Sequence, residues 1–361
     1  MHHLVVLQHG LWGKPKHLGY IQQQLETFDK HDQIIVLNCA ENEGTNTYDG
    51  IDICGNRVVA AVQAEIKRLQ TEDDVTVTKI SFIGYSLGGL ILRYAVGRLF
   101  TLGLFKQVEP ISFITLATPH LGSCKHPEFL FNRIYNFMTS FFVYRTGLQL
   151  NLVDDYHDKG PLLLIMSDPE LSFHKGLKLF KRKICYANTK NDRVVRYTTS
   201  SISHSNPYRK FALKSRFEDG KYPSIVSHDA SQEPPSWDWR WNELAVFSAF
   251  LVLTPALFPL WIAIAMLGLT GTRVYKMLRG YDPKHHSNWF IEHHGDLLDD
   301  RGVIDPKAIR KCMIDNLNQL DWEKYDTYFR FTNGHGSIVV RNWAFSKYKD
   351  VVQHLIDHLE V

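Results

Sequence analysis

The sequence predicts one α/β domain in which a mostly parallel central sheet carries helices on both faces. Two observations support this prediction. Strand-like and helix-like segments alternate from the first residues to about residue 120, as in consecutive βαβ units. In addition, 44% of the 361 residues are hydrophobic, which suffices for a buried core. The chain is therefore expected to form a single domain over residues 1–361.

The expected elements follow from residue type and periodicity. Runs rich in β-branched and apolar residues predict strands at Leu4–Gln8, Gln33–Leu37, Val75–Ile83, Ile111–Leu116 and Lys183–Ala187. Helices are expected at the polar stretch Gly19–Phe28, at Asn56–Gln70 with its helical spacing, and at the apolar run Gly89–Val96. Parallel strands share one carboxyl edge, and the sites of open α/β sheets lie there.

Overall charge and cysteine content narrow the function classes. The formal net charge of +3, from 41 basic and 38 acidic residues, gives no reason to expect nucleic acid, although a mildly basic surface suits anionic lipid. The five cysteines have no CxxC spacing, and their odd number argues against a disulfide framework. The N-terminus enters the first predicted strand without a secretory signal. These features favour a reducing, intracellular location.

A serine lies between two glycines where a predicted strand meets a predicted helix. The segment is Gly84-Tyr85-Ser86-Leu87-Gly88. This is the pattern of a nucleophile elbow, in which small residues let a serine occupy a strained turn between strand and helix. The pattern alone is common, so its strand-helix context carries the prediction. Ser86 is the expected nucleophile of an α/β-hydrolase fold.

A serine nucleophile needs a base and an acid that orients the base, which in this fold follow in the order Ser, Asp or Glu, His. Asp192 is the best acid, because it lies in the loop that leaves the strand Lys183–Ala187. The alternatives Asp154, Asp155 and Asp168 are less well placed.

The base is harder to choose among 18 histidines. His335 fits best, because it lies late in the chain in the flexible-looking loop Asn333-Gly334-His335-Gly336-Ser337. His120 is a weaker alternative. The cluster His285, His286, His293 and His294 lacks a clear metal-ligand pattern, so neither a metal nor any other cofactor is expected.

The loop after the first strand, His9-Gly10-Leu11-Trp12-Gly13, is expected to form part of an oxyanion hole. The backbone N–H groups of Leu11 and Leu87 are the predicted donors. His9, Gly10 and Trp12 are expected to line the substrate pocket, as is His120 from the loop after Ile111–Leu116, with His9 in a structural role.

Two segments interrupt the α/β rhythm. Residues 125–180 begin with an aromatic-rich stretch, Glu128–Leu150, that is expected to form a lid or pocket wall, with a plain core helix as the alternative. The run Leu244–Thr272 contains no charged residue and is flanked by tryptophans and by basic residues, as membrane-associating segments are. The alternative for this second segment is a buried helical hairpin.

The apolar run is better suited to a hairpin than to a span. Pro255 and Pro259 divide it into arms of about ten to twelve residues, each too short for a bilayer core of roughly 30 Å. A single span would also place His335 on the opposite side of the membrane from Ser86. Residues 236–280 are therefore predicted to form a hairpin insertion that enters and leaves one face of a membrane or lipid droplet.

These segments together resemble the serine esterase/lipase family of α/β hydrolases, and within it the fungal lipid-droplet phospholipases. The matching stretches are His3–Gly13, Phe82–Gly89, Leu116–Gly122, Tyr186–Val195 and Gly334–Asn342. The resemblance implies a cofactor-free carboxylic ester hydrolase acting on glycerolipids, phospholipids or lysophospholipids first, with Ser86, Asp192 and His335 as the triad. It also implies association with lipid droplets or the endoplasmic reticulum, with the catalytic domain facing the cytosol.

Three alternatives to phospholipid hydrolysis remain open. The same triad would serve a triacylglycerol lipase or an acyltransferase. A catalytically silent membrane-tethering protein with the same fold is the alternative outside the enzymes. The oligomeric state is not indicated by the sequence.

Overall fold

The computed structural model describes residues 2–28, 33–123, 143–217, 220–231, 286–300, 302–330 and 333–360. Within these residues the strands form one sheet in the order β2-β1-β3-β4-β5-β8-β7-β6. Their bounds are β1 His2–Gln8, β2 Ile34–Asn38, β3 Val77–Tyr85, β4 Glu109–Leu116, β5 Arg182–Asn188, β6 Ala212–Ser215, β7 Ile225–Asp229 and β8 Glu323–Thr327. Neighbours from β2 to β8 pair in parallel, whereas β6 and β7 are antiparallel additions.

The helices are of two types, α and 3-10. The α-helices are α1 Gly19–Phe28, α2 Ile51–Glu72, α3 Leu87–Thr101, α5 Tyr144–Leu150, α6 Leu162–Ile165, α7 Ser172–Lys178, α8 Tyr197–Ser200, α10 Asn288–His294, α11 Pro306–Asn318, α12 Gly334–Ser337 and α13 Lys349–Asp357. Short 3-10 helices are η1 Pro15–Leu18, η2 Gly44–Tyr48, η3 Leu104–Lys106, η4 Pro207–Arg209, η5 Gly295–Leu297 and η6 Trp343–Tyr348.

Local signals explain where some of these helices begin. The Asp305 side chain accepts a hydrogen bond from the Lys307 N–H at 2.9 Å, and Pro306 occupies the first position of α11. Ser287 caps α10 in the same way, with its Oγ accepting from the Phe290 N–H at 3.1 Å. Both caps satisfy N–H groups that have no acceptor within the helix.

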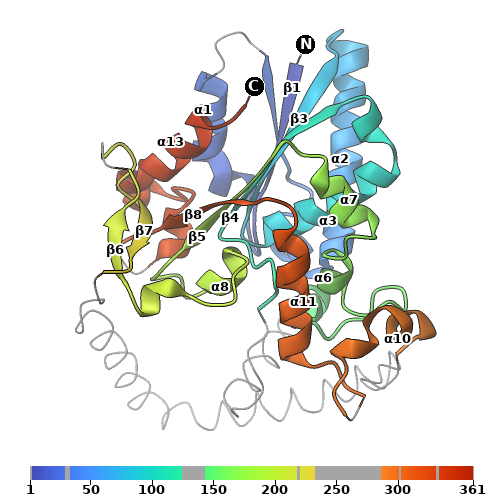
Figure 1. Ribbon diagram of the computed structural model, residues 1–361. Coiled ribbons are helices and arrows are strands. Elements are labelled where there is room, and N and C mark those ends of the chain that lie inside the picture. The colour runs from blue at the N-terminus through green and yellow to red at the C-terminus, as the bar shows by residue number, and fades with distance from the viewer. Residues whose placement is uncertain are drawn as a thin grey trace, which may run out of the picture.

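Helices cover both faces of the sheet. Helices α1 and α13 lie on one face, and α2, α3 and α7 lie on the other (Figure 1). The strand β1 shows how the sequence supports both layers, because Leu4 and Val6 enter the core beneath α2 and α3 while Val5 and Leu7 enter the core beneath α1 and α13. The predicted α/β fold, with its mostly parallel sheet and two helical layers, is confirmed.

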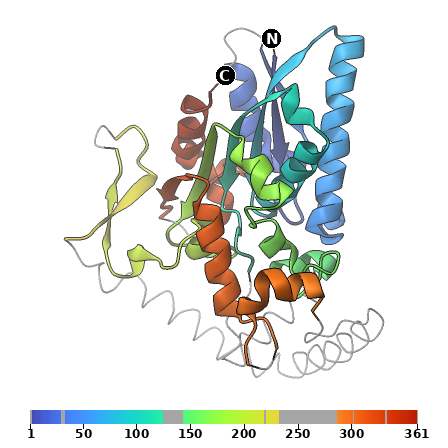
Figure 2. The ribbon, with the colours of Figure 1, turned by 45° about the vertical axis from the view of Figure 1, so that its right-hand side comes forward.

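The structure also contains elements that the sequence did not predict. Strands β6 and β7 form a hairpin that stands at one edge of the sheet (Figure 2). Both strands are short, and their residues are largely accessible, so they lack the apolar run that identifies a buried strand. The expected flexible loop around His335 is instead a single turn of helix, α12.

The two unusual segments are only partly covered by the structure. The predicted apolar hairpin, residues 236–280, and the start of the predicted lid, residues 125–142, lie outside the described residues. In the remainder of residues 125–180, α7 packs against α3, and Phe173 lies against Gly97 of that helix. Across the described parts of the chain, no helix combines the length and apolar character that a membrane span requires.

Candidate active site

Ser86 occupies a strained turn between β3 and α3. Its φ of 55° and ψ of −127° place a residue with a side chain in a backbone region that few residues other than glycine adopt. The turn is held by a hydrogen bond of 2.8 Å from the Ser86 N–H to the Leu116 carbonyl at the end of β4. The side chain of Ser86 is therefore presented at the carboxyl edge of the sheet.

Glycines around this turn are required by close contacts. A Cβ at Gly88 would lie 2.1 Å from the Gln8 carbonyl oxygen, and one at Gly84 would lie 2.5 Å from Gly89 Cα. A Cβ at Gly10 would lie 2.6 Å from Ser86 Cβ. Since real contacts of this kind are far longer, only glycine allows β1, β3 and α3 to approach as they do.

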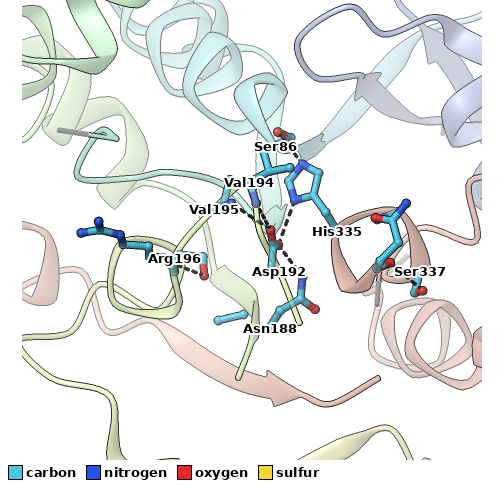
Figure 3. Close-up of polar contacts among 12 residues, drawn as sticks. Ser86, Asn188, Asp192, Val194, Val195, Arg196, His335 and Ser337 are labelled. Atoms are coloured by element: carbon cyan, nitrogen blue, oxygen red, sulfur yellow. Dashed lines mark hydrogen bonds and ion pairs between the residues drawn. The ribbon is translucent and has the colours of Figure 1, made fainter. Parts of the chain in front are cut away.

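Ser86, His335 and Asp192 form a hydrogen-bonded chain (Figure 3). His335 Nε2 lies 3.0 Å from Ser86 Oγ, and His335 Nδ1 lies 2.8 Å from Asp192 Oδ2. The three residues lie in the segments that follow β3, β5 and β8, which lie near one another in the sheet although Ser86 and His335 are 249 positions apart. Both distances are within the reach that proton transfer requires.

The Asp192 carboxylate is surrounded by donors. Its Oδ1 accepts from the N–H groups of Val194 and Val195 at 2.9 and 2.8 Å, and its Oδ2 accepts from Asn188 Nδ2 at 2.7 Å as well as from His335. Burial acts to raise the pKa of Asp192, but the hydrogen bond and charge of His335, with the Val195 and Asn188 bonds, outweigh it and hold that pKa below its ordinary value. The carboxylate is therefore ionised at neutral pH.

An ionised Asp192 fixes the tautomer of His335. A carboxylate can only accept, so Nδ1 must carry a proton and donate it. Nε2 of the neutral imidazole is then the acceptor for the Ser86 hydroxyl. This is the state in which a histidine can act as general base toward a serine.

The turn that carries His335 is tied to the loop that carries Asp192. Asn333 caps α12, with its Oδ1 accepting from the Gly336 N–H at 3.1 Å, and the Gly334 N–H donates to the Asn191 carbonyl at 3.0 Å. Asn191 is itself held by a bond of 2.7 Å from its Nδ2 to the Phe329 carbonyl. The distance between base and acid is thus set by backbone contacts as well as by their own hydrogen bond.

Tyr85, the residue before the nucleophile, also contacts the base. Its hydroxyl donates to the His335 carbonyl at 3.0 Å, and the two ring centroids lie 5.1 Å apart. The sequence pattern indicated no role for Tyr85 or for Asn188. The available signals were a phenol inside the elbow motif and an amide at the end of a strand beside the predicted acid.

We expect Tyr85→Phe to lower kcat while leaving KM within about twofold. The variant keeps the ring beside His335 but loses the hydroxyl that fixes the His335 backbone. The free energy of one such hydrogen bond corresponds to a decrease in kcat by a factor of about 3 to 10. The control is Tyr94→Phe on α3, whose hydroxyl bonds to Tyr156 at 2.9 Å and not to the triad. Equal kcat values for Tyr85→Phe and wild type, from steady-state kinetics on a soluble ester, would contradict this role.

The predicted oxyanion donors lie beside Ser86. Leu87 is the first residue of α3, where N–H groups have no acceptor within the helix and the helix dipole favours negative charge. Leu11 follows Gly10, which touches Ser86. Their role as donors stays a prediction.

The other predicted pocket residues differ in exposure. His9 is buried, its Nδ1 donates to the Gly10 carbonyl at 3.0 Å, and burial lowers its pKa, so it supports the loop as a neutral side chain. Trp12 is 54% exposed and lies against Tyr48. His120 is fully buried beside Trp322, with Nε2 3.0 Å from Thr115 Oγ1, and burial holds its pKa well below the ordinary value.

The alternative acids have other partners. Asp154 Oδ2 accepts from the Leu162 N–H at 3.0 Å, Asp155 Oδ1 accepts from the Gly160 N–H at 2.8 Å, and Asp168 Oδ2 lies 3.5 Å from His294 Nε2. Across the part of the chain that the structure describes, no group of three or more histidine, cysteine or acidic side chains is arranged to hold a metal ion. His285 of the considered cluster lies outside the described residues.

Asp154 provides a test of stability against pH. Asp154 is half-buried with its Oδ1 atom shielded from solvent, and this burial raises its pKa to about 7. A raised pKa means that the folded state holds the proton that the unfolded chain releases, so stability falls as the pH rises from about 4 to 7. We expect Asp154→Asn, which cannot ionise, to gain Tm relative to wild type between pH 5 and pH 8. A difference in Tm that is the same at both pH values would contradict this.

Comparison with known proteins identifies the family. The sequence profile described as "Putative serine esterase (DUF676)" matches residues 1–204, more than half of the chain. The chain belongs to this serine esterase family. The match contains Ser86 and Asp192, whereas His335 lies beyond it. Serine esterases are carboxylic ester hydrolases, and the elbow geometry described above suits that chemistry.

Curated relatives of the chain include proteins from two yeasts. "Putative lipase ROG1" of Saccharomyces cerevisiae is 36% identical over 208 residues, which are 55% of this chain and 28% of the relative. "Putative lipase C4A8.10" of Schizosaccharomyces pombe is 31% identical over 212 residues, which are 56% of this chain and 26% of the relative. The match therefore spans only about a quarter of each of these relatives.

Solved structures show more distant similarity. Phospholipase PlaB from Legionella pneumophila in complex with thio-NAD is similar over 54% of this chain and 40% of its own, at 16% identity and a TM-score of 0.36. The lin2722 gene product from Listeria innocua is similar over 55% of this chain and 77% of its own, at 12% identity and a TM-score of 0.32.

Proposed function

We propose that the protein hydrolyses acyl esters of glycerolipids through a triad of Ser86, His335 and Asp192. The observation that carries the proposal is the position of His335, which lies within hydrogen-bond distance of both Ser86 Oγ and the Asp192 carboxylate. In this arrangement a nucleophile, a base and an orienting acid lie in the order that acyl transfer uses.

The proposed reaction has two halves. Ser86 Oγ attacks the ester carbonyl carbon while its proton passes to His335 Nε2, and the carbonyl electron pair moves to an oxygen held by the N–H groups of Leu11 and Leu87. The ester C–O bond then breaks, and the alcohol leaves with the proton from His335. Water, deprotonated by His335, attacks the acyl-enzyme in the same way, and the carboxylic acid is released as Ser86 recovers its proton.

Phospholipids or lysophospholipids are the proposed substrates. The support is the uncharged run Leu244–Thr272, whose composition suits a lipid surface. In the proposed arrangement this run forms a hairpin on one face of a lipid droplet or endoplasmic reticulum membrane, and the catalytic domain faces the cytosol. A hairpin keeps Ser86 and His335 on the same side, as their hydrogen bond requires.

Product analysis on defined lipids tests the substrate class. Purified protein is incubated with phosphatidylcholine, lysophosphatidylcholine or triacylglycerol, and fatty acid and glycerolipid products are measured by mass spectrometry. We expect fatty acid release from the phospholipids. Release from triacylglycerol alone would favour a triacylglycerol lipase, and transfer of the acyl group to an added lipid alcohol would favour an acyltransferase.

Labelling with a fluorophosphonate probe tests the mechanism separately. An activated serine forms a covalent adduct with such a probe, so we expect peptide mapping to place the adduct on Ser86. Absence of labelling together with absence of hydrolysis on all lipids would favour a silent membrane-tethering protein instead.

A further inference from the structure

The two segments that supply Asp192 and His335 also carry the exposed cations Arg193 and Arg341, the half-buried cation Lys190, and exposed apolar side chains. From the acid loop come Lys190, Arg193 and Val194, and from the segment after α12 come Arg341 and Trp343. Val194 is 59% exposed, and Trp343 is 87% exposed, the highest among the large hydrophobic side chains that the structure describes. These five residues form the cationic rim of the site.

Hydrogen bonds and packing join the two halves of the rim. The Gly334 N–H donates to the Asn191 carbonyl at 3.0 Å, between Lys190 and Arg193. On the other side, the Arg341 N–H donates to the Gly336 carbonyl at 3.1 Å, and Phe345 of η6 packs against Gly336. The rim therefore borders the contact between His335 and Asp192.

The positive charge of the rim is not neutralised within the described structure. Other arginines there are paired, such as Arg57 with Asp49 at 2.5 Å and Arg182 with Glu323 at 2.6 Å. Lys190, Arg193 and Arg341 form no such ion pair with a described carboxylate. The carboxylate between them, Asp192, is turned inward onto His335.

We propose that the cationic rim docks the protein on an anionic lipid surface with Ser86 facing the lipid. Lysine and arginine are attracted to anionic headgroups, and a tryptophan side chain is favoured at the boundary between headgroups and acyl chains. Charge complementarity favours this occupant, because Arg193 and Arg341 are exposed, Lys190 is half-buried, and none of the three is paired with a described carboxylate. The inference rests on the proposed lipid substrate. It adds that the lipid surface containing this substrate carries negatively charged headgroups.

Vesicle flotation of the full chain tests the proposal. Binding is measured on phosphatidylcholine vesicles and on vesicles containing one fifth phosphatidylserine. Binding through other apolar segments contributes to both measurements, so the difference between them reports the effect of anionic headgroups. We expect phosphatidylserine to strengthen binding of the wild type by at least tenfold. One cation near an anionic surface strengthens membrane binding about fivefold. The double variant Lys190→Ala/Arg193→Ala should therefore lose most of the gain that phosphatidylserine gives.

Matched controls lie at the opposite edge of the sheet. Lys106 ends η3 before β4, and Lys178 ends α7 before β5, so Lys106→Ala/Lys178→Ala removes two exposed cations away from the triad. For the aromatic part, Trp343→Ser is compared with Leu102→Ser, which lies at the end of α3 and is 53% exposed. We expect the controls to keep the phosphatidylserine gain and Trp343→Ser to weaken binding to both vesicles about threefold or more.

Hydrolysis of a dispersed short-chain ester separates the two proposals. This activity needs the triad but no lipid surface, so we expect the rim variants to retain it within about threefold of wild type. Two outcomes with a protein that cleaves the soluble ester would overturn the docking proposal alone. In the first, the wild type binds both kinds of vesicle equally. In the second, the rim variants and the control variants lose the same amount of binding. A wild type that cleaves no ester overturns the proposed function.

Discussion

Replacing Ser86 by alanine is expected to lower kcat for ester hydrolysis by a factor of about 10⁴ to 10⁶. Ser86 Oγ lies 3.0 Å from His335 Nε2, and no other hydroxyl forms a bond with that nitrogen in the described structure. Without Oγ no acyl-enzyme forms, and only binding and oxyanion stabilisation remain to assist attack by water. Steady-state rates on a soluble ester, with the fluorophosphonate adduct as a second readout, measure the effect.

The matched control is Ser112→Ala. Ser112 is another buried serine, on β4, and its Oγ makes no hydrogen bond, so its removal should leave both activity and Tm close to wild type. Ser86→Ala should likewise keep its fold, because the bond that holds the turn comes from the Ser86 backbone. Unchanged hydrolysis by folded Ser86→Ala would exclude Ser86 as the nucleophile.

Strands β1 to β5 and helices α1, α2 and α3 could be predicted because their buried residues leave a clear pattern in the sequence, whereas β8, α11 and α13 were not predicted. The predicted strand Ile111–Leu116 corresponds to β4, Glu109–Leu116, and the other predicted strands are displaced by at most two residues at their ends. The β6–β7 hairpin lacked this signal, because no residue of β6 is buried and β7 buries only the adjacent pair Ile225 and Val226, which is too short a run to identify a strand.

The candidate site was predictable where a motif or chain order constrained it. Ser86, Asp192 and His335 were selected by a turn motif, a strand end and a late position, and the structure places them in hydrogen-bond contact. The supporting residues Tyr85 and Asn188 could not be predicted. Tyr85 contacts His335, which is 250 positions away in the sequence, and Asn188 contacts Asp192 within one loop. Neither contact leaves a periodic pattern in the sequence. The helical turn of α12 escaped prediction because its four residues include two glycines.

Replacing Asp192 by asparagine is expected to lower kcat by a factor of about 10³ to 10⁴. Four N–H donors meet the Asp192 carboxylate, from Val194, Val195, Asn188 and His335. An asparagine has one oxygen, which accepts, and one NH₂ group, which only donates. One of the two pairs of N–H donors must therefore face an NH₂ group instead of an acceptor. If the NH₂ group faces His335, Nδ1 becomes an acceptor, and the protonated Nε2 cannot take the proton of Ser86.

The stability of this variant should depend on pH in a defined direction. The folded-state pKa of Asp192 is held below its ordinary value. The carboxylate therefore stabilises the fold fully at pH values above the ordinary pKa, and this contribution to stability is lost as the pH falls through the folded-state pKa. The difference in Tm between wild type and Asp192→Asn should therefore be largest near pH 7 and shrink toward pH 3.

The control for the kcat measurement is Asp168→Asn, which alters a buried carboxylate near His294 and leaves the bonds of His335 intact. Its kcat should stay within about twofold of wild type. If Asp168→Asn lost activity and Asp192→Asn did not, the acid of the triad would be misassigned. Loss of activity in both would instead show that the 168–294 contact supports the site from outside the hydrogen-bonded chain.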